Sequence, residues 1–276
     1  MKIQIINVWN ELEAYIQAVE NGKNPEEEWE KQVIATCWEQ LCCYAPMDLS
    51  ERKPGVIKDT KILTEQVKKL KEINIEGLRE EFERIATVLP NYDDDPITVA
   101  LFPSDAQNET VNEKQNGVIG TALFGNLIIQ INPLIEQYEK WIPYVFAHEY
   151  HHTVWGNYWF MLHGGCLENK FIDALMIDGE ADSFALSQYP DLKPEWIFGL
   201  SKDEVENLWN QQYKAIVQNK DVDYGTYMFG NEEAGIPWCA GYAIGYMLVQ
   251  RYIEKTGNEI LAMLEKKPED ILDVIW

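Results

Sequence analysis

Residues 141–152 read Trp-Ile-Pro-Tyr-Val-Phe-Ala-His-Glu-Tyr-His-His, and the four histidines of this 276-residue chain all lie between His148 and His163. Within this stretch His148, Glu149 and His152 form the pattern His-Glu-x-x-His. Residues four apart lie on one face of an α-helix, so both imidazoles can bind one zinc ion while Glu149 lies beside the open coordination position. The spacing therefore predicts a metal-binding helix, with Glu149 as the general base of a hydrolytic reaction.

The flanking residues favour a helix at this position. Pro143 suits the first turn of a helix, and residues 144–147 form an apolar run that predicts burial in a core. After His152 the sequence becomes aromatic and Gly-rich over residues 155–168, which predicts a connecting loop. We expect His163, which lies in this loop, to form hydrogen bonds there rather than to bind the metal.

A third metal ligand must come from later in the chain, because a catalytic zinc ion normally has three protein ligands and one water. The metzincin pattern is excluded, because Trp155 and Tyr158 stand where that class has Gly and His. The best remaining source is the acidic segment Asp178-Gly-Glu-Ala-Asp182, which lies in a predicted helix over residues 169–188. Zinc peptidases of a related kind take their third ligand from a carboxylate on a following helix.

The acidic segment offers three carboxylates that do not all face the same way. Asp178 and Asp182 are four residues apart and share a face, so one can bind the metal while the other hydrogen-bonds a ligand histidine. Glu180 is rotated from Asp178 by about 200°, so the two are not expected to bind the metal together. The spacing alone leaves open which of Asp178 and Asp182 is the ligand and which is its support.

Hydrophobic periodicity predicts a mostly helical chain with a small sheet before the metal-binding helix. The helical patterns cover residues 8–21, 25–44, 59–73, 76–88, 169–188, 201–218, 238–256 and 257–266, with another after Pro268. The predicted strands are residues 97–102, 118–123 and 127–131, with a polar loop at 104–117 and a hairpin turn at 124–126. We expect an α+β fold in which an N-terminal helical region, 1–90, packs with residues 91–276 as one compact unit.

Composition limits the partners and the compartment. The formal net charge of −23 disfavours nucleic acid and anionic lipid surfaces as partners. No apolar run approaches the length of a membrane span, and the N-terminal residues lack the features of a secretory signal. An odd number of cysteines without Cys-x-x-Cys spacing predicts reduced thiols in the cytoplasm. These cysteines are Cys37, Cys42, Cys43, Cys166 and Cys239.

Three blocks of the chain, taken in order, resemble the YjaZ-like bacterial family of predicted zinc-dependent proteases. The blocks are residues 148–152, residues 178–185 and residues 240–246 with Gln250-Arg-Tyr252, so the resemblance covers roughly residues 95–256. It implies a gluzincin-like site in a zincin-like catalytic domain, residues 91–276, with a small sheet over the metal-binding helix. The family's second block usually begins with a Glu as presumed ligand, whereas this chain has Asp178. The resemblance therefore favours Asp178 as the third ligand, with Glu180 as the alternative ligand and Asp182 as the supporting residue.

The third block predicts a helix packed close to the site. Gly241 and Gly245 lie four apart and permit close backbone approach. Zinc peptidases commonly use a Tyr or His donor to stabilise the oxyanion, so Tyr242 is the candidate here, although a core aromatic residue explains it equally well. Residues 127–131 are expected to present a strand edge to an extended peptide.

The sequence therefore predicts a cytoplasmic zinc metallopeptidase, a hydrolase that acts on a peptide or protein substrate. Its expected site residues are the metal ligands and catalytic groups His148, Glu149, His152, Asp178 or Glu180, and Tyr242. The alternative is a zinc-stabilised binding or regulatory protein that keeps the zincin fold without turnover. The two differ in whether the metal keeps an open position for water.

Overall fold

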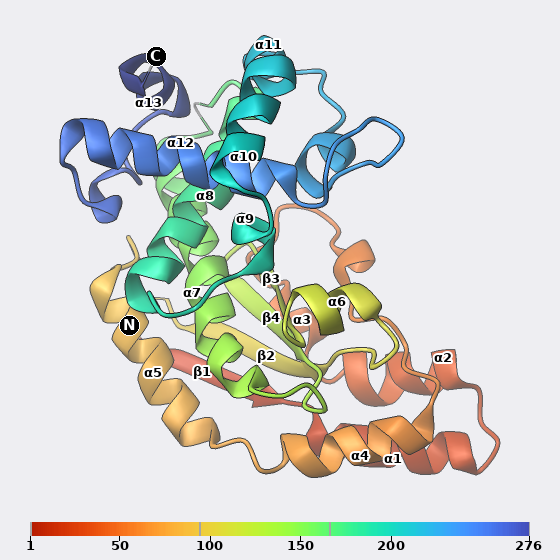
Figure 1. Ribbon diagram of the computed structural model, residues 1–276. Helices are drawn as coiled ribbons and strands as arrows, with labels where there is room; N and C mark the ends of the chain where they lie inside the picture. Colours follow the sequence, from red (N-terminus) through yellow and green to blue (C-terminus); the bar gives the residue numbers. More distant parts are fainter. Residues whose placement is uncertain (1, 94, 166, 276) are drawn as a thin grey trace. The chain divides into compact units, whose positions relative to one another are not determined.

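Two strongly apolar strands lie at the centre of a four-stranded mixed sheet of order β1-β2-β4-β3 (Figure 1). The strands are β1 (Ile3–Asn7), β2 (Ile97–Pro103), β3 (Val118–Leu123) and β4 (Asn126–Ile131). Strands β1 and β4 run parallel to β2, whereas β3 is antiparallel to β4. Every residue of β2 is buried, as expected for a strand that is covered on both faces.

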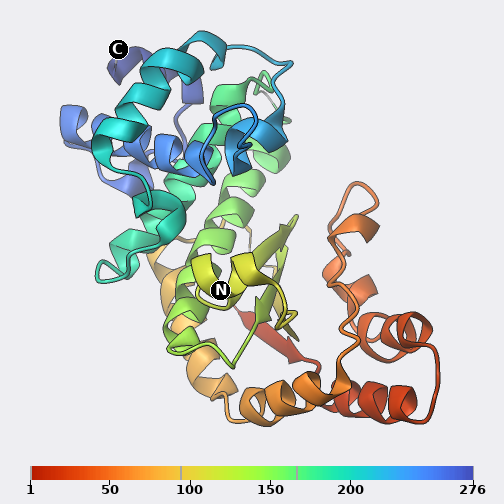
Figure 2. The ribbon, with the colours of Figure 1, turned by 45° about the vertical axis from the view of Figure 1, so that its right-hand side comes forward.

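The structure is a computed structural model that describes residues 2–93, 95–165 and 167–275. The chain forms two compact units. One unit ends at Val154 and the other begins at Trp155. The division near residue 90 stays a prediction, and β1 pairs across it with β2, in register from Ile3 opposite Ile97. The N-terminal region thus supplies a strand to the sheet, and Figure 2 shows this strand from a second direction.

The prediction of a mostly helical α+β fold is confirmed, and the arrangement is consistent with a zincin-like fold. The helices of the first unit are α1 (Trp9–Glu20), α2 (Pro25–Trp29), the π-helix η1 (Glu30–Ile34), α3 (Trp38–Leu41), the 3-10 helix η2 (Ser50–Arg52), α4 (Thr60–Leu70), α5 (Ile75–Val88), α6 (Glu109–Lys114) and α7 (Tyr138–Gly156). The side chains of Asn24, Asp59, Asn74 and Asn108 accept hydrogen bonds from the first turns of α2, α4, α5 and α6. These short polar residues supply the acceptors that helix N-termini lack.

Three helical expectations for the first unit need correction. The predicted helix 25–44 is divided into α2, η1 and α3, with a turn before Trp38. The predicted loop 104–117 contains α6, whose cap, Asn108, was an available signal. Helix α7 begins at Tyr138, so Pro143 lies inside the helix rather than in its first turn. The buried side chains of Tyr138 and Trp141 explain this earlier start, because they extend the apolar face of the helix.

A buried asparagine ties the N-terminal helices to the sheet. The Asn126 side chain accepts a hydrogen bond from the Thr98 amide at 2.8 Å, and it donates to the carbonyls of Gln40 and Leu41 at 3.2 and 3.1 Å. Asn126 is fully buried, so each of these bonds replaces one to water. This network fixes the end of α3 against the start of β4.

The regular elements of the second unit, within its described residues, are all helices joined by turns and loops. Its elements are the π-helix η3 (Asn157–Leu162), α8 (Phe171–Gln188), α9 (Glu195–Phe198), α10 (Lys202–Leu208), the π-helix η4 (Trp209–Tyr213), α11 (Lys214–Ile216), the π-helix η5 (Gly225–Phe229), α12 (Ala240–Thr256), the 3-10 helix η6 (Ile260–Ala262) and α13 (Pro268–Ile275). Part of the aromatic segment 155–168 is therefore helical, not a loop as expected. Among the described residues, no helix combines the length and the apolarity that crossing a membrane requires.

Helices α8 and α12 cross with their backbones in contact, and Figure 1 shows α12 running across α8. A Cβ atom on Gly245 would overlap the Leu175 carbonyl oxygen and lie 3.3 Å from the Gly179 Cα. A Cβ atom on Gly179 would overlap the backbone of Gly245. The expected close approach at Gly245 is thus present, whereas Gly241 instead faces Met228 and the Tyr227 carbonyl.

Gly245→Ala is expected to lower the free energy of unfolding by about 3 kcal/mol, because the added methyl meets backbone atoms that cannot rotate away. Gly156→Ala is the matched control. Gly156 has helical φ and ψ and nothing within 4 Å of an added Cβ, so alanine there is expected to stabilise by up to about 1 kcal/mol. Chemical denaturation of both variants tests this; equal stabilities would contradict it.

Candidate metal centre

Helix α7 presents its two motif histidines side by side. The Nε2 atoms of His148 and His152 lie 3.0 Å apart, and the two rings are nearly perpendicular. Two nitrogens bound to one tetrahedral zinc at ordinary bond lengths lie about 3.3 Å apart. The imidazoles are therefore already arranged with their ring nitrogens converging on one point.

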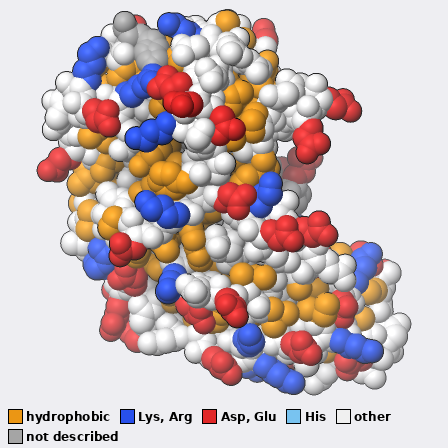
Figure 3. Space-filling view, in the orientation of Figure 1, with side chains coloured by type: hydrophobic (Ala, Val, Ile, Leu, Met, Phe, Trp, Pro, Cys, Tyr) orange, Lys and Arg blue, Asp and Glu red, His pale blue; other side chains and the backbone are white. Residues whose placement is uncertain are grey.

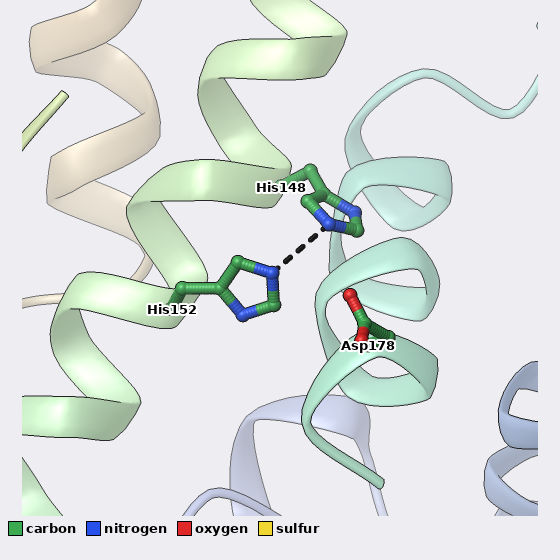
Figure 4. A group of neighbouring side chains, drawn as sticks. All are labelled: His148, His152 and Asp178. Atoms are coloured by element: carbon green, nitrogen blue, oxygen red, sulfur yellow. Dashed lines mark hydrogen bonds between the residues drawn. The ribbon is translucent and has the colours of Figure 1, made fainter. Parts of the chain in front are cut away.

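The described residues include one group of three side chains with the spacing of a metal site. One ligand atom from each of His148, His152 and Asp178 lies within 4.8 Å of the others. Figure 4 draws these side chains, His148 and His152 from α7 and Asp178 from α8. Two imidazole nitrogens and one carboxylate oxygen are a donor set that suits zinc.

Glu149 lies next to these histidines on α7 and is nearly buried, with 9% of its surface exposed. Its side chain packs against β3, at Gly120. Among the described residues, the structure gives its carboxylate no hydrogen-bond or ion-pair partner. Neither of its carboxylate oxygens is among the fully buried atoms that lack a partner, so the carboxylate keeps contact with solvent and can accept a proton from a water molecule.

The other two acids of the predicted segment are deeper in the second unit. Glu180 and Asp182 have no exposed surface. Burial raises the pKa of Glu180 to about 8, so the neutral carboxyl is favoured in the absence of a metal. Both carboxylate oxygens of Asp182 accept from the indole N–H of Trp196, at 3.1 and 3.2 Å. Of the two candidate third ligands, Asp178 is the one that lies near the histidines.

Tyr242 lies in the first turn of α12, in the same unit as Asp178. Its pKa is raised well above the usual value, first by burial and then by the negative charge of Asp178. The hydroxyl therefore stays protonated and can donate a hydrogen bond. The ring packs near Phe229, with centroids 5.9 Å apart, and it also borders the apolar core of this unit.

The remaining histidines have other surroundings. His163 is exposed, and one of its ring nitrogens lies 2.8 Å from the Tyr158 carbonyl oxygen, in agreement with the expected hydrogen-bonding role. His151 is buried. Cys37, Cys42, Cys43 and Cys239 form no disulfide, and Cys166 lies outside the described residues.

Sequence reasoning missed two residues beside the site and misplaced the sheet edge. Trp196 bonds Asp182 from 14 positions away, which no local pattern indicates. Gly120 could have been found from the sequence, because a glycine inside a predicted strand often marks the close approach of another group. The prediction of an exposed edge at residues 127–131 is wrong, because β4 lies between β2 and β3. The hairpin turn alone could not show which of its strands pairs with β2.

Charged side chains of both signs are mixed on the surface drawn in Figure 3, where lysines and arginines lie singly among acids. The chain has 23 basic and 46 acidic residues.

Comparison with known proteins agrees with the metal-site geometry. A family model described as "Predicted Zn-dependent protease (DUF2268)" matches residues 75–273. The chain is also 30% identical to "Uncharacterized protein YjfC" of Bacillus subtilis (strain 168), over 48% of this chain and 46% of that protein. The chain thus aligns with less than half of the length of this curated relative. No solved structure matches the chain.

We expect the purified protein to bind about one zinc ion per chain. His152→Ala should abolish this binding, because it removes one of two converging ring nitrogens. His163→Ala is the control, since that ring contacts Tyr158 and should leave the zinc content unchanged. Elemental analysis after zinc loading and desalting measures each outcome. Absence of zinc from the loaded wild-type protein, or its loss from the His163 variant, would contradict the assignment.

Proposed function

Because the chain belongs to the DUF2268 family of predicted Zn-dependent proteases, we propose that it is a zinc metallopeptidase that hydrolyses peptide bonds. The observation that supports this most directly is Glu149. It is a nearly buried carboxylate beside two converging imidazoles, and it has no hydrogen-bond or ion-pair partner among the described residues. A closed structural zinc site has no need for such a group.

We assign His148, His152 and Asp178 as the ligands. Bound zinc supplies a Lewis acid that lowers the pKa of its water to about 7 and polarises the substrate carbonyl. Asp178 is preferred to Glu180 because it belongs to the His-His-Asp group. Asp182 supports this part of α8, and the indole of Trp196 holds its carboxylate in place.

In the proposed reaction Glu149 is the general base. Its carboxylate takes a proton from the attacking water and later delivers it to the leaving amine nitrogen, so that the peptide bond breaks without a free amide anion. The Tyr242 hydroxyl donates a hydrogen bond to the oxygen that becomes negatively charged. Both roles need groups that are fixed in position, and both side chains lie on regular helices.

The proposed substrate is a peptide or protein in the bacterial cytoplasm. The thiols of the described cysteines support a reducing compartment. Strand β3 is an edge strand, because it pairs only with β4. An extended peptide can therefore pair with β3, and not with β4. Arg52 already donates a hydrogen bond to the Ala122 carbonyl of this strand at 2.9 Å.

Glu149→Gln is expected to retain zinc but to lower kcat by about 10²- to 10⁴-fold, because an amide cannot accept the proton. The assay uses zinc-loaded protein and a quenched-fluorescent peptide mixture of random sequence, with zinc content measured in parallel. Turnover by this variant at the wild-type rate would exclude the general-base role. If the zinc-loaded wild type cleaves none of the mixture, the alternative of a zinc-stabilised binding protein is favoured.

Tyr242→Phe tests the oxyanion role separately. It removes one hydroxyl and keeps the ring that packs near Phe229, so we expect a loss of about 10²-fold in kcat with little change in stability. Tyr246→Phe is the matched control on the same helix, because its ring packs on Phe198 with centroids 5.7 Å apart. Equal turnover by the two variants would assign Tyr242 to core packing alone.

A further inference from the structure

Gly120 occupies the middle of β3, where a glycine weakens a strand and must have a compensating reason. A Cβ atom built on it would overlap the Glu149 Cγ and lie 2.6 Å from the Glu149 Oε1. The same atom would lie 2.7 Å from the Val145 Cγ1. The side chains of Glu149 and Val145 therefore occupy the space that any other residue at position 120 would fill.

The periodicities of the two elements explain this contact. Val145 and Glu149 are four apart on α7 and so share one face. On β3, alternate residues point to the same side, so Val118, Gly120 and Ala122 share the face that meets this part of α7. Gly120 is the residue of β3 that the Glu149 side chain contacts.

Helix α7 is also held on a neighbouring face by contacts with α5 and with the residue that follows it, which limits how far the helix can shift. Phe146 stacks on Phe82 of α5, with ring centroids 3.9 Å apart and planes 10° from parallel. The Tyr150 hydroxyl donates to the Leu89 carbonyl at 2.8 Å. A methyl group at position 120 must therefore be accommodated mainly by the side chains of Glu149 and Val145.

We propose that Gly120 is a positioning residue, whose missing side chain sets where the Glu149 carboxylate lies. The consequence for catalysis rests on the proposed function, because it requires Glu149 to be the general base. A base must lie within hydrogen-bond reach of the proton it takes, and displacement by about 1 Å can lower the rate by about 10²-fold. A substitution at position 120 leaves the ligands His148, His152 and Asp178 unchanged.

The activity test compares Gly120→Ala with Gly55→Ala, whose added Cβ meets nothing within 4 Å. We expect Gly120→Ala to keep one zinc per chain and to lose about 10- to 100-fold in kcat on the random peptide mixture, with little change in KM. Gly55→Ala should match the wild type in zinc content, stability and turnover. Wild-type kcat for Gly120→Ala would overturn the proposal.

A double variant separates positioning from simple loss of stability. Val145→Ala removes one of the two clashes but leaves a cavity of its own, so Gly120→Ala should lower the thermal midpoint less in the Val145→Ala background than in the wild type, while kcat stays low. Recovery of kcat together with the midpoint would show that Gly120 only supports packing, and it would overturn the proposal.

The contact itself is tested without any turnover, in zinc-free protein. Glu149→Ala removes the overlapping Cγ and carboxylate, so Gly120→Ala should lower the thermal midpoint much less in that background than in the wild type. If the changes in thermal midpoint simply add, the contact between position 120 and Glu149 is excluded, even if the protein proves to be a peptidase. If the changes do not add and the protein cleaves no peptide, the contact is retained and only the proposed function is rejected.

Discussion

Two helices carry the polar groups of the candidate site, and each of them packs closely against a neighbouring backbone at a glycine. Glu149 fits against β3 because residue 120 has no side chain. In the second unit, α8 carries Asp178 while Gly179, the next residue, contacts the backbone of α12 at Gly245. Close packing is a property of protein interiors, and here it leaves little freedom for the positions of the side chains in the candidate site.

Burial also determines the chemical state of the groups around the site. It raises the pKa of Glu180 to about 8 and that of Tyr242 well above its usual range, because the charged forms lose their hydration. The acids of the segment 178–182 thus differ in their surroundings. Both carboxylate oxygens of Asp182 accept hydrogen bonds from the indole of Trp196, whereas Asp178 lies in a group with the two imidazoles.

The proposed function explains several features that structural roles alone leave without a reason. The donor set of two imidazoles and one carboxylate suits a catalytic zinc ion, which retains a position for water. In the proposed reaction the carboxylate of Glu149, which follows His148 on the same helix, is the proton acceptor. Membership of a family of predicted Zn-dependent proteases supports the same reaction class, and it does not specify a substrate.

The sequence by itself determined the spacing of His148, Glu149 and His152 and the strands that precede them, because helical and strand periodicities are local. It also located the acidic segment, yet only the structure groups Asp178 with the two histidines, which is the observation behind its proposal as the third ligand. Only the tertiary structure placed β1 beside β2, gave β3 the edge position and brought Gly120 to Glu149. These contacts join residues far apart in the chain, and their energies come from burial and fit, which no local pattern records.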